Sequence, residues 1–80
     1  MDKIKHIRKS IYDAEFNKSK LNESESVFIQ GQTGLKIRHL LNNIVNFEGA
    51  NYLEIGINRG ATLTSALFKN NVNSAYAIEI

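Results

Sequence analysis

Residues 52–60 read Tyr-Leu-Glu-Ile-Gly-Ile-Asn-Arg-Gly, an apolar run that enters a loop with a glycine at each end. Residues 51–55 are almost continuously apolar, which is typical of a parallel β-strand covered on both faces. A helical pattern starts at Gly60 and ends near Asn70, and residues 75–80 form a second apolar run. This order predicts a strand–helix–strand unit in which both strands lie parallel in one sheet.

Two further helices are predicted before this unit. A first apolar stripe recurs at spacings of three and four and predicts a helix over residues 3–17, with Asp2 as its N-cap. The stripe is thin, so we expect this helix to pack on another element. Residues 18–26 are polar and aperiodic and predict a loop. The stripe consists of Ile4, Ile7, Ile11 and Ala14.

A second helix follows the turn at residues 31–34 and is expected to end near Asn46. Arg38 and His39 lie off its apolar stripe, so we expect both side chains to be exposed. The stripe has the spacing of a helix that faces a core. It consists of Ile37, Leu40, Leu41, Ile44 and Val45.

Length and composition limit the possible classes of protein. The chain has 80 residues, no cysteine and a net charge of +2, which allows one small domain without disulfides and without a metal centre. No apolar run reaches the roughly 20 residues of a membrane span, and the charged start lacks the apolar core of a secretory signal. We therefore expect a cytoplasmic protein with no membrane partner. The basic first twenty residues are interpreted as a solvated helix face, with nucleic-acid binding as the less favoured alternative.

The predicted fold class is α/β, in the order helix–helix–strand–helix–strand. This order corresponds to the N-terminal portion of a doubly wound, Rossmann-like parallel sheet. Residues 1–30 form an N-terminal helix and polar linker, and residues 31–80 form a partial cofactor-binding βαβ domain.

The loop after the first strand carries the chemistry of the predicted site. Gly56 lets a ligand approach the backbone, and Gly60 allows close packing of helix on strand. Glu54 repels phosphate but can pair with an ammonium or sulfonium group. Glu79, at the end of the second strand, is placed to accept hydrogen bonds from the hydroxyl groups of a ribose. Two carboxylates beside a glycine loop favour a cationic nucleoside such as S-adenosylmethionine.

Residues 54–62 resemble motif I of the class I S-adenosylmethionine-dependent methyltransferases, and residues 75–79 resemble the strand that carries their ribose-binding acid. The resemblance covers roughly residues 31–80 and departs from the motif at Asn58, where the pattern has glycine. It implies a methyltransferase that binds S-adenosylmethionine, with Glu54 near the amino group, the Gly56–Gly60 loop around the methionine and ribose, and Glu79 on the ribose. The implied cofactor-binding residues are Glu54, Gly56, Ile57, Asn58, Arg59, Gly60 and Glu79.

Other interpretations remain open at this point. A nucleotide- or NAD-binding enzyme uses the same strand–helix–strand unit, although Glu54 and Asn58 argue against it. A truncated, non-catalytic remnant or interaction module is also possible, because two strands leave sheet edges unpaired. The 80-residue chain alone is expected to be inactive and to need a C-terminal half, a partner or self-association. The methyl acceptor and the catalytic residues are unknown, and Tyr52 and Tyr76 are interpreted as packing residues.

Overall fold

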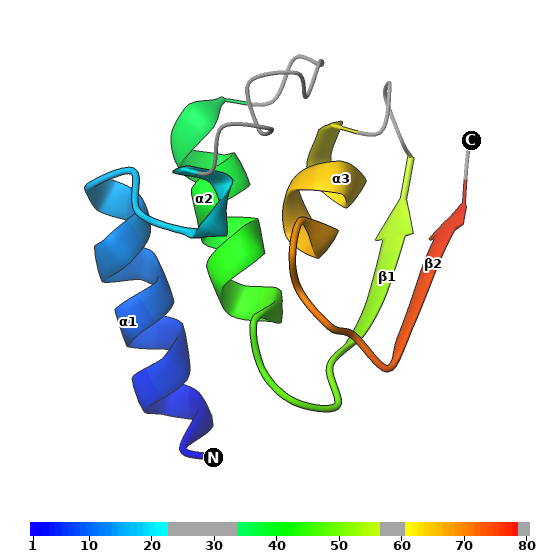
Figure 1. The fold of residues 1–80 in the computed structure, drawn as a ribbon, viewed down its shortest axis with the longest axis horizontal. Coiled ribbons are helices and arrows are strands. Elements are labelled where there is room, and N and C mark those ends of the chain that lie inside the picture. The colour runs from blue at the N-terminus through cyan, green and yellow to red at the C-terminus, as the bar shows by residue number, and fades with distance from the viewer. Residues whose placement is uncertain (23–33, 57–60, 79–80) are drawn as a thin grey trace.

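The computed structural model describes residues 1–22, 34–56 and 61–78 of the chain (Figure 1). The described helices and strands follow the predicted order, with one additional turn of 3-10 helix after the first helix. The elements are α1 (Lys3–Glu15), η1 (Lys20–Asn22), α2 (Leu35–Val45), β1 (Asn51–Ile55), α3 (Ala61–Leu67) and β2 (Ser74–Ile78).

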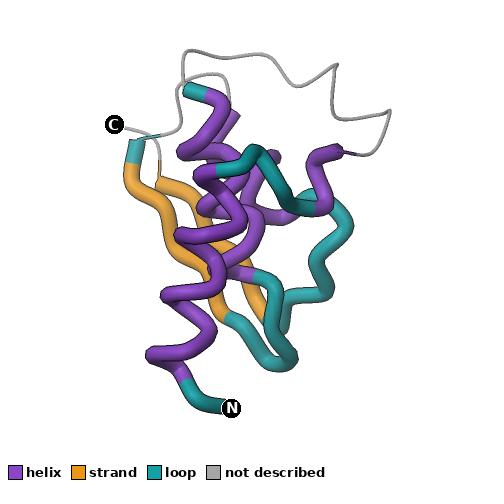
Figure 2. Tube along the Cα trace, turned by 90° about the vertical axis from the view of Figure 1, so that its left-hand side faces the viewer, coloured by secondary structure: helices purple, strands orange, loops and turns teal. Residues whose placement is uncertain are grey.

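The two strands form a parallel sheet, as the strand–helix–strand pattern predicted. Asn51 lies opposite Ser74 at one end, and Ile55 lies opposite Ile78 at the other. Helix α3 connects the strands, and all three helices lie to one side of the sheet (Figure 1). Figure 2, which looks at the molecule from the side of α1, shows the strands behind the helices. The described chain is therefore a mixed α/β structure with a helical layer and a two-stranded parallel sheet.

Helix α1 has the predicted N-cap and an end that its sequence explains. The Lys5 backbone N–H donates to Asp2 Oδ1 at 3.1 Å, which satisfies one of the free donors of the first turn. The helix ends where Asn17 adopts a φ of 55°, a left-handed conformation that asparagine tolerates better than most residues. The Asn17 N–H then donates to the Ala14 carbonyl at 2.9 Å.

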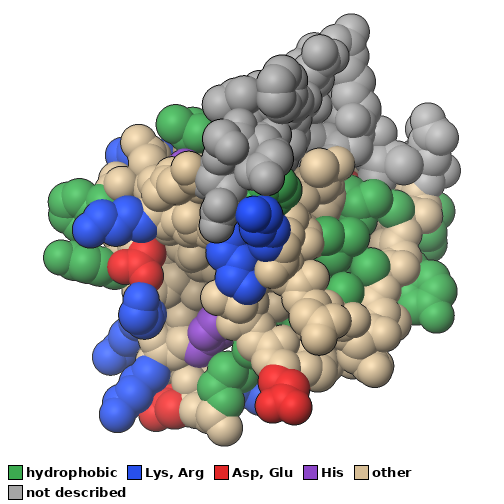
Figure 3. Space-filling model, in the orientation of Figure 1, with side chains coloured by type: hydrophobic (Ala, Val, Ile, Leu, Met, Phe, Trp, Pro, Cys, Tyr) green, Lys and Arg blue, Asp and Glu red, His purple; other side chains and the backbone are tan. Residues whose placement is uncertain are grey.

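Helices α1 and α2 pack antiparallel. Lys36 in the first turn of α2 pairs with Glu15 at the end of α1, with Nζ and Oε2 3.2 Å apart. At the other end, His6 Nε2 lies 2.8 Å from the carbonyl oxygen of Ile44. Lys and Arg side chains gather over α1 at the surface (Figure 3), which agrees with a solvated basic face.

Helix α1 packs on α2, as expected, but three of the four residues of its apolar stripe are exposed. Ala14 is buried, but Ile4, Ile7 and Ile11 are exposed, with Ile4 at 64%. The contact with α2 uses the neighbouring small-residue face instead, where Ser10 is also buried. Small side chains let the two backbones approach closely enough for the Asn43 amide to donate to the Ser10 carbonyl, at 3.3 Å. Polar contacts from α2 have therefore set the rotation of α1.

The apolar core is small and lies between α2, α3 and β1. It is built around Val45, Ala50 and Ala66, which are each at least 94% buried. Since α3 contributes only an alanine at the centre of this cluster, the helix sits close to its neighbours. The partly buried hydrophobic residues packed against the cluster are Leu41, Phe47, Tyr52 and Val72.

A network of polar side chains occupies the rest of the interior. Asn42 is fully buried and bonds to both η1 and the backbone of α3. Asn70 Nδ2 donates to the Asn42 carbonyl at 2.8 Å and to the Ala66 carbonyl at 2.7 Å. Buried backbone groups at the ends of short elements need partners, and these amides supply them.

The prediction of an exposed His39 is wrong, because this side chain retains only 2% of its accessible surface. Its Nδ1 atom lies 2.6 Å from the Ser19 hydroxyl oxygen, which also accepts a hydrogen bond from the Leu21 N–H at 3.0 Å. The segment that includes η1 covers this face of α2, so the residues that face it are polar. Arg38, by contrast, is partly exposed. Ile37, on the predicted apolar stripe, is also exposed.

Burial lowers the pKa of His39 below the ordinary histidine value, which makes stability depend on pH. As pH falls below about 6.5, the unfolded chain takes up a proton before the folded chain does. We therefore expect the free energy of unfolding to be highest above that pH. It should fall as the pH is lowered from about 6.5 through the pKa of His39 in the folded state. Urea unfolding between pH 8 and pH 5 measures this loss. His39→Gln should flatten the curve, and parallel curves for the two proteins would contradict the assignment to His39.

Candidate functional site

The site predicted from the sequence lies at the carboxyl end of β1. The structure describes two of its seven residues, Glu54 on β1 and Gly56 directly after it. The other five lie outside the described residues, so the structure does not test whether the two predicted carboxylates share one cleft. These five residues are Ile57, Asn58, Arg59, Gly60 and Glu79.

Gly56 lies directly after β1 and has a backbone conformation that favours glycine. Its φ is +80°, a left-handed conformation that residues with a Cβ rarely adopt. Its N–H donates to the Ile78 carbonyl at 2.6 Å, which joins the ends of the two parallel strands. Among the described residues, a Cβ built at this position would have no neighbour within 4 Å, so these residues leave space beside the Gly56 backbone.

Glu54 is held by a tyrosine of the same strand. Residues two apart on a strand point to the same face, and both Tyr52 and Glu54 are partly buried on the side of the helices. The Tyr52 hydroxyl donates to Glu54 Oε1 at 2.6 Å. The second oxygen, Oε2, is buried and has no hydrogen-bond partner in the described part of the chain. One carboxylate oxygen therefore has a donor, and the other has none among the described residues.

The electrostatics of this pair favour a cationic ligand. Burial raises the pKa of Tyr52 well above its ordinary value, and the hydrogen bond and negative charge of Glu54 raise it further. The phenol therefore remains protonated and acts as a donor at physiological pH. A buried carboxylate oxygen without a donor is unfavourable by about 1–3 kcal/mol or more. An ammonium group placed against Oε2 would remove this penalty, whereas a phosphate would be repelled.

Tyr52 is the site residue that the sequence interpretation missed, because it was treated only as a packing residue. Its ring does pack against the core cluster, but its hydroxyl serves Glu54. The Tyr-x-Glu spacing on a predicted strand is a signal for this pair, since the two side chains must share a face. Tyr76 lies on β2 opposite Leu53 and is exposed. Tyr76 is therefore neither a packing residue of the core nor a partner of Glu54.

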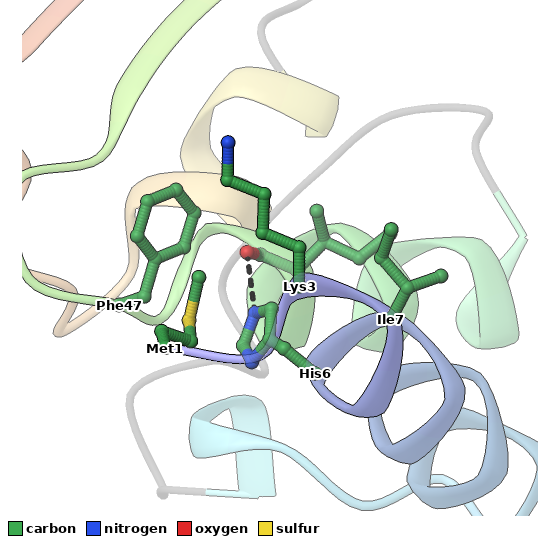
Figure 4. Close-up of a pocket in the computed structure, with 6 residues that line it drawn as sticks. Met1, Lys3, His6, Ile7 and Phe47 are labelled. Atoms are coloured by element: carbon green, nitrogen blue, oxygen red, sulfur yellow. Dashed lines mark hydrogen bonds between the residues drawn. The ribbon is translucent and has the colours of Figure 1, made fainter.

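Several cavities of the described structure lie away from Glu54. One of about 270 Å³ lies between the start of α1 and the end of α2 (Figure 4). In it, the His6 ring meets the edge of the Phe47 ring at a centroid distance of 5.6 Å, and the Lys3 side chain passes between them and Ile7. Two others, of about 300 Å³ each, adjoin Asn71 at the amino end of the sheet. The predicted site is at the opposite end.

No group of three or more His, Cys, Asp or Glu side chains in the described ranges is arranged to hold a metal ion. None of the helices described is both long enough and apolar enough to cross a bilayer.

Comparisons of the chain with models of protein families, with characterised proteins and with solved structures found no match.

Proposed function

We propose that the chain is the N-terminal part of an S-adenosylmethionine-dependent methyltransferase and that Glu54 and the loop beginning at Gly56 bind the cofactor. Three features support the proposal. The sheet is parallel, α3 joins its two strands, and a glycine with a left-handed φ directly follows the carboxyl end of β1. Ligands of open α/β sheets bind at this end of the strands.

The observation that carries the proposal is the buried Glu54 oxygen that has no hydrogen-bond partner in the described ranges. S-adenosylmethionine has an amino-acid ammonium group and a sulfonium centre, and it has no phosphate. A carboxylate with one oxygen fixed by Tyr52 and the other without a donor suits the ammonium group. The same carboxylate disfavours the pyrophosphate of a nicotinamide dinucleotide. This contrast ranks the methyltransferase above the nucleotide-binding alternative.

The exposed face of the sheet supports the proposal that this unit belongs to a larger, doubly wound sheet. We expected β1 to be covered on both faces, but its face away from the helices has no cover from the described elements. Leu53 and Tyr76 lie opposite each other there and are 61% and 67% exposed. Hydrophobic side chains are visible at the surface over β1 and β2 (Figure 3). Parallel sheets normally bury both faces, so further strands and helices, or another chain, would complete this one.

Direct titration tests the proposed function. S-adenosylhomocysteine, which keeps the ammonium group, should bind the wild-type chain and shift the amide resonances of Glu54 and Gly56 in NMR spectra. Glu54→Gln should raise its dissociation constant about tenfold, because one charge-assisted hydrogen bond is lost. Glu48→Gln, at an exposed position before β1, is the matched control. NAD should produce no shifts at these amides.

Two results would contradict the proposal. Tight NAD binding without a response to S-adenosylhomocysteine would favour the nucleotide-binding alternative. A folded chain that binds neither ligand would favour a non-catalytic interaction module, for which the exposed apolar face of the sheet is the supporting observation.

A further inference from the structure

We propose that Tyr52 is a positioning residue of the cofactor site, which holds the carboxylate of Glu54 so that its free oxygen receives the ammonium group of the ligand. The inference rests on the proposed function and extends it to a residue outside the glycine motif. Tyr52 does not itself touch the ligand in this proposal. It acts through Glu54.

The two carboxylate oxygens of Glu54 differ in their hydrogen bonding. The Tyr52 hydroxyl has one proton to donate, and it donates to Oε1 at 2.6 Å. This distance is typical of a strong hydrogen bond between a hydroxyl group and a carboxylate. Oε2 is buried without a partner among the residues described. The tyrosine therefore determines which oxygen lacks a donor within the described part of the chain.

The Tyr52 side chain is held in place by the apolar core. Its ring packs against the cluster of Val45, Ala50 and Ala66, which are all buried. A glutamate side chain on an unsupported strand samples several rotamers, and ordering it on binding costs conformational entropy, which lowers the affinity for the ligand. Anchoring Oε1 to a core residue removes part of this cost before the ligand arrives. Tyr52 thus preorganises the site.

The protonation state of the Tyr52 phenol also suits this role. Burial and the neighbouring carboxylate both raise the pKa of Tyr52, so the hydroxyl remains a donor at physiological pH. Tyr76 provides the contrast within the same sheet. It lies in register with Leu53, whose side chain points to the face opposite Tyr52, and it is exposed.

Tyr52→Phe tests the proposal, because it keeps the ring in the core and removes only the hydroxyl group. Two probes are compared by calorimetry: S-adenosylhomocysteine, and methylthioadenosine, which lacks the ammonium group. We expect Tyr52→Phe to raise the dissociation constant of S-adenosylhomocysteine about fivefold and to leave that of methylthioadenosine unchanged. Tyr76→Phe should change neither. The double variant Tyr52→Phe/Glu54→Gln should bind no more weakly than Glu54→Gln, because the two residues act as one unit.

A second measurement needs no ligand. The Tyr52 hydroxyl proton, held by a carboxylate, should give a downfield NMR signal that exchanges slowly with water in the wild-type chain. Glu54→Gln should move the signal upfield, because the charged acceptor becomes a neutral amide. Tyr76→Phe should leave it in place.

The possible outcomes separate this inference from the proposed function. If Tyr52→Phe weakened the binding of both probes equally, the role of Tyr52 would be purely structural and the inference would be overturned. A hydroxyl signal that does not move in Glu54→Gln would also overturn it. Loss of affinity for Glu54→Gln alone would also overturn it, while leaving the proposed function intact. If the wild-type chain binds neither probe, the proposed function fails, and the hydroxyl signal still decides whether Tyr52 holds Glu54.

Discussion

Asn42→Ala should lower the free energy of unfolding by about 3 kcal/mol, because it leaves several buried backbone groups without partners. Asn42 is fully buried. Its Oδ1 accepts from the Lys20 N–H at 3.0 Å, and its Nδ2 donates to the carbonyls of Ser65 at 2.8 Å and Phe68 at 2.9 Å. One side chain therefore joins η1, α2 and α3. A domain of this size has few kilocalories in reserve, so the variant should be largely unfolded at 37 °C.

Urea unfolding followed by circular dichroism measures the loss. Asn71→Ala is the matched control, since Asn71 is exposed and should change stability by less than about 0.5 kcal/mol. Asn42→Asp sharpens the test, because it keeps the shape and turns an oxygen toward the two carbonyl groups. It should destabilise at least as strongly as alanine. A loss no larger than that of the control would show that the network contributes little to folding.

Ala66→Leu should lower the free energy of unfolding by about 2 kcal/mol, through overpacking of the small core. Ala66 is completely buried on α3 and packs with Val45 and Ala50. A leucine at this position needs space that the close approach of α2 and α3 does not provide. The helix must move outward, which would also lengthen the hydrogen bonds that Asn42 makes to the carbonyls of α3.

Thr64→Leu controls for the side chain introduced, because Thr64 is an exposed position on the same helix. Thermal unfolding of the two variants should show a lower midpoint for Ala66→Leu alone. If both variants kept the midpoint of the wild-type chain, the core around Ala66 would accommodate the larger side chain. A lowered midpoint for both would assign the effect to the helix rather than to its packing.

The strand–helix–strand unit was predictable because its signals are local. Two apolar runs, a glycine turn and a helical pattern follow one another within about thirty residues, and each is set by backbone sterics or side-chain periodicity. The N-cap at Asp2 was predictable for the same reason, since its hydrogen bond spans three residues. Of the candidate site, the structure describes Gly56 with a left-handed φ of +80°, a conformation that favours glycine. The positions of Glu79 and the rest of the loop remain predictions.

The buried faces of α1 and α2 were not predictable from periodicity alone. Apolar spacing favoured the isoleucines of α1, yet the contact is made by Ser10 and Ala14. In α2, His39 is buried beside the Ser19 hydroxyl, and Asn42 is buried where it bonds to backbone groups of η1 and α3. These partners lie twenty or more residues away in the sequence.

The order of elements and the parallel unit thus come from interactions between near neighbours, which a single sequence displays. The rotation of each helix, and the pairing of the Tyr52 hydroxyl with Glu54 rather than with solvent, depend on which elements meet in space. Side-chain hydrogen bonds and close packing between distant segments decide these features, because a buried polar group must find its partner wherever the fold places one.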